Sequence, residues 1–274
     1  MQANKAIVNG ELVLQSSATL GINDLSIVRG YGIFDYFKTV GGRPIFWEDN
    51  LDRFYHSAQL MDLPVSYTRE QLKAMIELLM AENNIPDSGI KLLLTGGYSP
   101  DGYSVAEPNL VITQHPLTRN VQAEKNGMKL ISYDFHRPFG TAKSIDYVMG
   151  IQAMKKAKQV GANDVVYTYN GLVSECPRAN IFFVTKDGKL ITPGNDVLRG
   201  ITKIHVINMV QGQYEVEDRD VTVKEMKNAA EAFITSTTKN ITPILSIDDT
   251  VYGSEPGPIT KQLQRQLDEV IYGG

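Results

Sequence analysis

Cysteine and histidine are scarce in this sequence. Its 274 residues include one cysteine, Cys176, and four histidines. A single cysteine cannot close an internal disulfide, which favours a reducing compartment such as the cytoplasm. The histidines lie far apart, and no group of His and Cys has metal-ligand spacing, so no metal site is expected. No motif links Cys176 to a histidine, and we interpret it as a buried, unreactive thiol.

Strong charge bias and long hydrophobic runs are also missing. The chain has 27 Lys and Arg against 31 Asp and Glu, a formal net charge of −4. Because it contains no run of five or six like charges, nucleic acid is not an expected partner. No stretch approaches 18 consecutive apolar residues, and the first ten residues are too polar for a secretory signal. We therefore expect a soluble, cytoplasmic protein with no membrane partner.

The common phosphate-binding motifs are absent as well. The chain has no Gly-x-x-x-x-Gly-Lys-Ser/Thr loop, and the glycine-rich segment 96–102 lacks the dinucleotide fingerprint. We interpret that segment as a loop.

Apolar patterning predicts strands and helices that interleave along the chain. Asn9-Gly10 between two short apolar runs is typical of a tight hairpin. Helical spacing predicts helices over 51–61, 72–80, 144–160, from about 203, and over 260–271. Strands are expected over 5–8, 11–13, 91–95, 110–113, 128–133, 164–169, 172–175, 181–185, 189–192 and 232–235. This order predicts an α/β or α+β fold with mixed sheets.

Chain length and one polar stretch indicate two domains. A chain of 274 residues with 42% hydrophobic content can bury two modest cores. The apolar pattern lapses over 114–127, which is typical of a connection between domains. We place the boundary near residue 118, with a small α/β domain over 1–118 and a larger domain over 119–274.

Six short segments stand out along the chain. They are RGYGIFD at 29–35, LDRF at 51–54 with SA at 57–58, KSIDY at 143–147, VSE at 173–175 with NIF at 180–182, GITK at 200–203, and EAFITST at 231–237. Together they resemble the class IV aminotransferase family, which includes D-amino acid and branched-chain aminotransferases and aminodeoxychorismate lyases. They occur in the family's order and at roughly its spacing.

The resemblance implies a fold, a cofactor and an assembly. The fold would be the two-domain, fold type IV architecture of D-amino acid aminotransferases. Pyridoxal 5'-phosphate would be the cofactor, held mainly by the larger domain, and amino acids and 2-oxo acids would be the substrates. The active site would lie between the domains of a homodimer and be completed by the partner subunit.

Lys143 matches the family's catalytic lysine, which forms the resting imine with the cofactor and carries a proton during transamination. A lysine taken without its context is far more often a solvated surface residue. Only the surrounding motif reverses that expectation.

The resemblance also implies roles for cofactor-binding residues. Glu175 would keep the pyridine nitrogen protonated, Asn180 would support the site, and Tyr147 would lie near the ring hydroxyl. The phosphate would accept hydrogen bonds from a positive helix start and from an arginine. By resemblance, these donors are Arg53, the backbone amides of Ile201 and Thr202, and the hydroxyl of Thr237.

Substrate recognition is less defined in the sequence. Arg29 and Arg178 are the candidates to bind the substrate carboxylate, because a guanidinium donates two parallel hydrogen bonds to it. Tyr31 and Thr238 are the other predicted substrate contacts. The loop 98–103 contains no arginine, so the sequence matches neither the D-amino acid pattern of the family, which uses arginine and histidine, nor its branched-chain pattern, which uses backbone amides and a tyrosine. We favour a D-amino acid or broad-range transaminase, with branched-chain activity open.

Two alternatives use the same residues. An aminodeoxychorismate lyase would use the same cofactor contacts to eliminate pyruvate. A non-catalytic protein that binds the cofactor would have no need for both Lys143 and Glu175.

Overall fold

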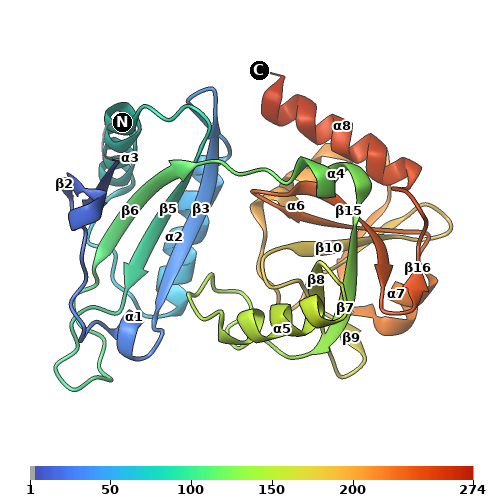
Figure 1. Cartoon of the computed structure of the whole chain (residues 1–274), viewed down its shortest axis with the longest axis horizontal. Helices are drawn as coiled ribbons and strands as arrows, with labels where there is room; N and C mark the ends of the chain where they lie inside the picture. Colours follow the sequence, from blue (N-terminus) through green and yellow to red (C-terminus); the bar gives the residue numbers. More distant parts are fainter. Residues whose placement is uncertain (1–3, 274) are drawn as a thin grey trace. The chain divides into compact units, whose positions relative to one another are not determined.

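The computed structural model describes residues 4–273, and the chain divides into two compact units (Figure 1). The first unit contains Met1–Thr118 and also Ala142–Asp146, and the second contains Arg119–Thr141 and Tyr147–Gly274. The segment with Lys143 therefore folds with the first unit, although it follows the predicted boundary in sequence.

The first unit contains one antiparallel sheet of six strands. In spatial order these are β2 Glu11–Leu14, β1 Lys5–Val8, β6 Leu110–Pro116, β5 Ser88–Thr95, β3 Gly32–Val40 and β4 Arg43–Pro44. The predicted hairpin of β1 and β2 is confirmed, with positive φ angles at Asn9 and Gly10. The sequence patterns did not predict β3, which pairs with β5 over eight residues.

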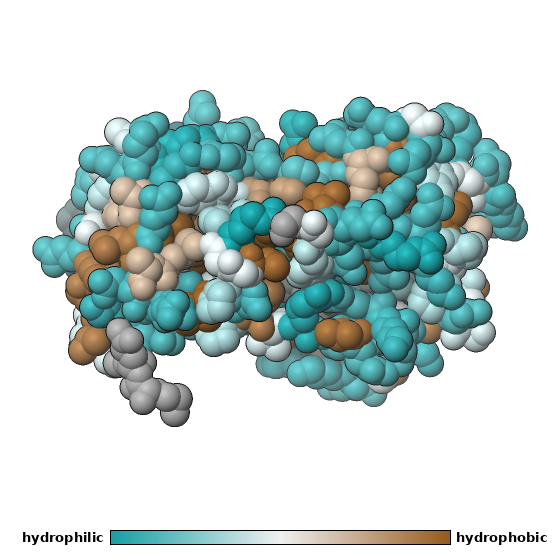
Figure 2. All heavy atoms as spheres, turned by 90° about the horizontal axis from the view of Figure 1, so that it is seen from above, coloured by the Kyte–Doolittle hydropathy of each residue, from teal (hydrophilic) through white to brown (hydrophobic). Residues whose placement is uncertain are grey.

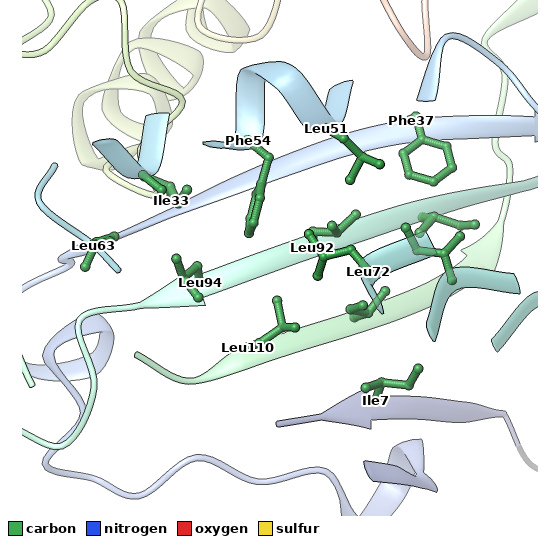
Figure 3. Packing of buried hydrophobic residues seen from close by; sticks show 14 of the residues in the cluster. Ile7, Ile33, Phe37, Leu51, Phe54, Leu63, Leu72, Leu92, Leu94 and Leu110 are labelled. Atoms are coloured by element: carbon green, nitrogen blue, oxygen red, sulfur yellow. The ribbon is translucent and has the colours of Figure 1, made fainter. Parts of the chain in front are cut away.

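Two long helices supply the core on this sheet. They are α2 Trp47–Leu60 and α3 Arg69–Asn83, both predicted, and α3 begins with a capping box of Thr68 and Gln71. Leu51 and Phe54 of α2 and Leu72 of α3 are among the apolar side chains that pack against the strands (Figure 3). Two short helical segments, η1 Gln15–Ser17 and α1 Leu25–Val28, lie between β2 and β3 in the chain.

The second unit contains a mixed sheet of ten strands. Its order is β12 Val216–Arg219, β11 Leu190–Pro193, β10 Asn180–Val184, β14 Glu231–Ser236, β15 Asn240–Ile247, β7 Met128–Asp134, β8 Asp164–Tyr169, β9 Leu172–Val173 and β13 Val221–Thr222, with β16 Thr250–Val251 paired to β15. The pairs β11–β12, β15–β7 and β7–β8 are parallel, and the others are antiparallel. The predicted α/β class with mixed sheets is confirmed.

Five helices accompany this sheet: α4 Val121–Asn126, α5 Val148–Gln159, α6 Ile201–Met209, α7 Val223–Asn228 and α8 Pro258–Tyr272. A buried carboxylate caps α8, because Glu231 accepts hydrogen bonds from the backbone amides of Ile259 and Thr260 and from the Thr260 hydroxyl.

The structure differs from the sequence predictions at three further places. Within the polar stretch 114–127, α4 forms behind its cap, Asn120, and was not predicted. The helix predicted from Ser144 begins at Val148, since Ser144 instead pairs with Ile33 of β3. No strand was predicted over β15, where Pro243 lacks a donor that a central strand normally supplies.

One face of the surface is mostly hydrophilic. Hydrophilic residues cover most of the face drawn in Figure 2, and hydrophobic residues show between them. Among residues 4–273, no helix is long and apolar enough to cross a membrane.

Candidate active site

The backbone around Lys143 is hydrogen-bonded to β3. Its carbonyl accepts a hydrogen bond from the Phe34 amide at 3.0 Å, and its amide donates to the Ser57 hydroxyl at 3.1 Å. The Ile145 amide donates to the Gly32 carbonyl at 3.0 Å. Ser144 forms a short antiparallel bridge with Ile33 of β3. The side chain of Lys143 is partly buried, and its Nζ lies 4.6 Å from the centre of the Phe34 ring. The backbone that carries Lys143 is therefore fixed at three points.

Arg53 makes a forked ion pair with Asp35. Nε donates to Oδ2 and Nη2 to Oδ1, both at 2.8 Å, and Nη2 also reaches the Asn50 side-chain oxygen at 3.2 Å. Both charged side chains are almost fully buried. Nη1 takes part in none of these bonds, so it is the nitrogen that remains for an incoming anion.

The predicted substrate residues of the first unit lie around α1. The Tyr31 hydroxyl donates to the Met61 carbonyl at 2.6 Å, and burial, assisted by Asp62, raises the pKa of Tyr31. Arg29 follows α1, is exposed, and lies over the Tyr103 ring at 5.5 Å. Both belong to the segment that links α1 to β3.

A buried carboxylate positions that segment. Asp24 caps α1 by accepting from the Ser26 amide, and its other oxygen accepts from the Thr95 hydroxyl at 2.7 Å and the Asn109 side-chain amide at 2.8 Å. The cap is thus tied to the adjacent ends of β5 and β6.

In the second unit, Glu175 is held on both carboxylate oxygens. Oε1 accepts from Arg137 Nε at 2.9 Å and Nη2 at 2.7 Å. Oε2 accepts from the Leu198 amide at 3.2 Å and lies 3.5 Å from Nδ2 of Asn180. The Arg137 guanidinium offsets the charge of a carboxylate that is only 6% exposed.

Asn180 connects this carboxylate with the turn before α6. Its Nδ2 donates to the Leu198 carbonyl at 2.8 Å. A Cβ added to Gly200 would overlap the Asn180 side-chain oxygen, so a larger residue there would require Asn180 to move.

The start of α6 has backbone donors with no side-chain cap. Gly200 is the N-cap residue and supplies none, while Ile201 and Thr202 in the first turn are buried. The amides of a first helical turn have no intrahelical partner, and they carry the positive end of the helix dipole. This turn can therefore bind an anion.

The turn between β14 and β15 contains Thr237 and Thr238, which are both partly buried. The next residue, Lys239, donates to the buried carboxylate of Asp164 at 2.7 Å. On β14, the Thr235 hydroxyl is buried and has no hydrogen-bond partner among the residues described.

The other predicted site residues of this unit differ in exposure. Tyr147 is partly buried and precedes α5 as its N-cap residue. Arg178 is exposed in a tight turn closed by the pair Cys176 and Ala179. Cys176 is buried, as expected, and burial raises the pKa of its thiol well above the ordinary value.

Comparison with known proteins identifies the family. The family model for class IV aminotransferases matches residues 32–247. The chain belongs to this family. The D-alanine aminotransferase of Listeria monocytogenes serotype 4b (strain F2365) is 33% identical across 97% of this aminotransferase and 96% of the relative. The predicted family and enzyme class are confirmed.

Solved structures show the same fold. The branched-chain aminotransferase of Escherichia coli superposes with a TM-score of 0.90 at 23% identity, over 99% of this aminotransferase and 96% of that chain. A branched-chain aminotransferase from Thermoproteus uzoniensis, crystallised with norvaline, gives the same TM-score at 25% identity, over 99% and 96%. The expected fold type IV architecture is confirmed.

The residues of the aminotransferase fit the family's cofactor, pyridoxal 5'-phosphate. The second unit offers a helix start without a side-chain cap and a buried Thr235 hydroxyl without a partner among residues 4–273. A held carboxylate, Glu175, lies beside them. The predicted cofactor is confirmed by family membership.

Two residues near the site were missed by sequence reasoning. Arg137 follows β7 and lies 38 positions before Glu175, and Lys203 is an almost fully buried lysine on α6. The GITK motif contained Lys203, but sequence reasoning assigned no role to it. Within residues 4–273, no group of three or more His, Cys, Asp or Glu could hold a metal ion.

Proposed function

We propose that this aminotransferase moves the amino group of a D-amino acid such as D-alanine to a 2-oxo acid such as 2-oxoglutarate or pyruvate. The observation that carries this proposal is the match to the Listeria D-alanine aminotransferase along nearly the whole of both chains. Branched-chain enzymes share the fold, but the E. coli likeness at 23% identity supports the fold alone.

Lys143 is the proposed catalytic residue. When bound, the cofactor supplies an electron-withdrawing ring that stabilises negative charge on the substrate α-carbon. Lys143 would hold the cofactor covalently through Nζ and, once displaced by the substrate amine, would carry a proton at Nζ away from the α-carbon. Its backbone bonds to Phe34 and Ser57 keep the start of the side chain fixed.

Glu175 would accept a hydrogen bond from the protonated ring nitrogen. Its two oxygens are held by Arg137, Leu198 and Asn180, so the carboxylate cannot rotate without losing these bonds. Asn180 is proposed as its support, and Tyr147 as the residue near the ring hydroxyl.

The phosphate would lie at the start of α6. The amides of Ile201 and Thr202 would donate to it, together with the Thr237 hydroxyl. Arg53 would contribute only through Nη1, because Asp35 already occupies Nε and Nη2. This differs from the forked contact that an unpaired arginine could make.

For the substrate carboxylate we retain Arg29 and Arg178 as candidates, with Tyr31 and Thr238 as further contacts. Both arginines are exposed, so each can turn toward a ligand at little cost in lost contacts.

We also propose that the enzyme is a homodimer of the cytoplasm, with functional domains over 1–118 and 119–274, apart from the segment Ala142–Asp146, which folds with the first unit. Large apolar side chains are exposed around α1 and the 97–107 loop, as at a subunit interface: Ile22, Ile27, Val28, Tyr98, Tyr103 and Val105. The free, buried Cys176 agrees with a reducing compartment.

The test of the catalytic assignment is spectroscopic. Purified protein given pyridoxal 5'-phosphate should absorb in the visible, and borohydride should bleach the band and fix the cofactor to Lys143. Lys143→Ala should lose the fixed adduct, whereas Lys158→Ala, which removes an exposed lysine of α5, should keep it. A wild-type protein that stays colourless would overturn the proposal.

The substrate assignment needs a second assay. A panel of D- and L-amino acids, each tested with 2-oxoglutarate and with pyruvate, should show turnover with D-alanine above that with L-leucine. A preference for L-leucine would replace the proposal with branched-chain activity. Release of pyruvate from aminodeoxychorismate without an acceptor would indicate the lyase instead.

A further inference from the structure

Lys203 in the first turn of α6 is one of the most deeply buried charged residues of the second unit. Its side chain is 3% exposed. Its Nζ donates to the Pro193 carbonyl at the end of β11 and to Oδ1 of Asp218 on β12, both at 2.7 Å. Burial lowers the pKa of Lys203, and the Asp218 carboxylate acts against that shift. One ammonium thus connects a helix start to the ends of two neighbouring strands.

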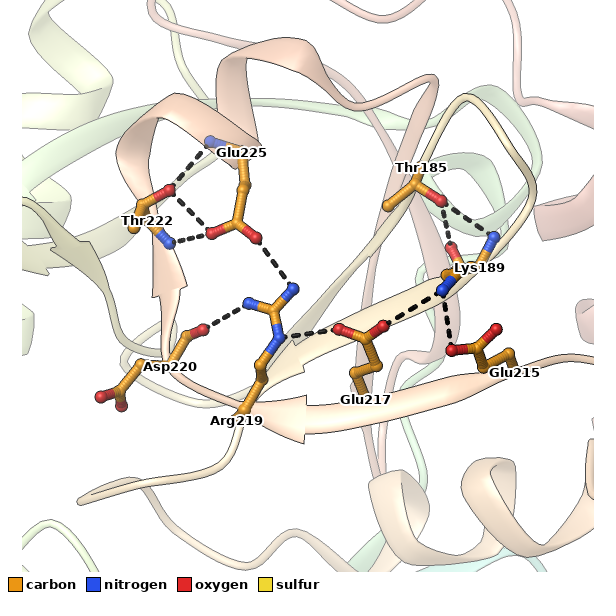
Figure 4. Close-up of polar contacts among 8 residues, drawn as sticks. All are labelled: Thr185, Lys189, Glu215, Glu217, Arg219, Asp220, Thr222 and Glu225. Carbon is orange, nitrogen blue, oxygen red and sulfur yellow. Dashed lines mark hydrogen bonds and ion pairs between the residues drawn. The ribbon is translucent and has the colours of Figure 1, made fainter.

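This contact is separate from the ion pairs on the other face of β12. Successive side chains of a strand point to opposite faces. Glu217 and Arg219 join a surface network with Lys189 and Glu225 (Figure 4). Asp218, which lies between them in sequence, instead pairs with Lys203. Lys189 and Lys203 therefore pair with adjacent strand positions but lie in different surroundings, since Lys189 is 35% exposed.

Burial of an ammonium is unfavourable, and an apolar side chain of similar length would fill the space without that cost. The ammonium does one thing that an apolar chain cannot do: it anchors α6 at its third residue through two hydrogen bonds. The two residues before it, Ile201 and Thr202, carry the amides that we propose as phosphate donors. On the other side of the turn, Asn180 holds the Leu198 carbonyl at 2.8 Å.

We propose that Lys203 is a positioning residue, which fixes the Ile201 and Thr202 amides in the direction of the cofactor phosphate. Lys203 makes no contact with the phosphate in this proposal and acts only through the helix start. The inference rests on the proposed phosphate site.

The experiment compares two ligands that differ only in the phosphate. Binding of pyridoxal 5'-phosphate and of pyridoxal is measured by visible absorbance, by dilution of the holoenzyme and by reloading after removal of the cofactor. The variants are Lys203→Met, Lys203→Arg and the control Lys189→Met. For Lys203→Met we expect the dissociation constant for pyridoxal 5'-phosphate to rise about tenfold or more, with that for pyridoxal changed less than about twofold.

The controls separate positioning from general destabilisation. Lys203→Arg should recover part of the affinity, because it keeps a charged donor, and Lys189→Met should behave as wild type toward both ligands. Equal weakening of both ligands by Lys203→Met, or unchanged binding of both, would overturn the proposal. If Lys203→Met does not fold, Asp218→Asn is the second variant. We expect it also to lose affinity for pyridoxal 5'-phosphate but not for pyridoxal.

The wild-type protein distinguishes this failure from failure of the proposed function. A wild type that binds pyridoxal 5'-phosphate no better than pyridoxal has no phosphate site, and both proposals then fall. A wild type that prefers the phosphorylated ligand, with Lys203→Met retaining the same preference, leaves the proposed function standing and removes only the role of Lys203.

Discussion

Arg137 contacts Oε1 of Glu175 through a hydrogen bond from Nε and an ion pair from Nη2. Its Nε lies 2.9 Å and its Nη2 2.7 Å from Oε1. The other oxygen of Glu175 accepts from the Leu198 amide. The carboxylate is therefore fixed from two sides by groups of the same unit, and its orientation depends on a residue that sequence motifs do not include.

Replacement of Glu175 by Gln should slow turnover without preventing cofactor binding. A neutral amide does not favour a protonated ring nitrogen, so we expect kcat to fall roughly a hundredfold, or about 2.7 kcal/mol. Arg137→Met should have a smaller effect, about tenfold, because Glu175 keeps its charge but loses its support. Steady-state kinetics with Lys261→Met as an exposed control test both; an unchanged kcat in Glu175→Gln would contradict the assigned role.

The Arg53–Asp35 pair should show strong coupling. Asp35→Asn leaves a buried guanidinium without its counter-charge and should reduce the free energy of unfolding by about 3 kcal/mol. The double variant Asp35→Asn with Arg53→Met should lose less than the sum of the two single variants. Urea unfolding of wild type, the two single variants and the double variant gives the free energies for this double-mutant cycle. Additive losses would show that the two charges do not stabilise each other.

The start of α7 should weaken in acid. Hydrogen bonds from the Thr222 backbone and hydroxyl, and then Arg219, lower the pKa of Glu225 from 4.5 to about 2. Because the folded pKa is the lower one, this stabilisation is present above pH 4.5 and is lost as the pH falls toward 2. Solvent screens this partly exposed group, so the effect should be below about 1 kcal/mol.

Comparison of wild type with Glu225→Gln isolates that contribution. The difference in unfolding free energy should be constant near neutral pH and should vanish in acid. A difference that persists unchanged down to pH 2 would assign the stabilisation to packing instead of charge.

Cys176 should make the protein less stable in alkali. Burial, assisted by Asp164, raises the thiol pKa above its ordinary 9.0. A raised folded pKa gives stabilisation that is complete below pH 9 and is lost as the pH rises further, by at most about 1.4 kcal/mol per pH unit.

Unfolding of wild type and Cys176→Ala between pH 7 and 10.5 measures this loss. We expect the advantage of wild type, about 1 kcal/mol at neutral pH, to shrink above pH 9. An advantage that stays constant to pH 10.5 would mean that the native thiol ionises as easily as the unfolded one.

Local rules account for the elements that the sequence predicted well. The β1–β2 hairpin depends on the positive φ angles of Asn9 and Gly10, and α3 on the cap formed by Thr68 and Gln71. These interactions join residues at most three positions apart. Prediction failed where residues distant in sequence determine the secondary structure. Ser144 pairs with Ile33 instead of starting a helix. β15 includes Pro243 because it pairs with β14 on one side and β7 on the other.

The candidate site divides in the same way. The sequence by itself determined the family and the candidate chemistry, because Lys143 and Glu175 lie in short motifs whose residue types the reaction requires. Only the tertiary structure decided which charged side chains form ion pairs with each other. The pairs Arg137–Glu175, Arg53–Asp35 and Lys203–Asp218 join residues 15 to 38 positions apart. Such contacts form only when strands take their register and side chains lose water together, and no local pattern of charges specifies them.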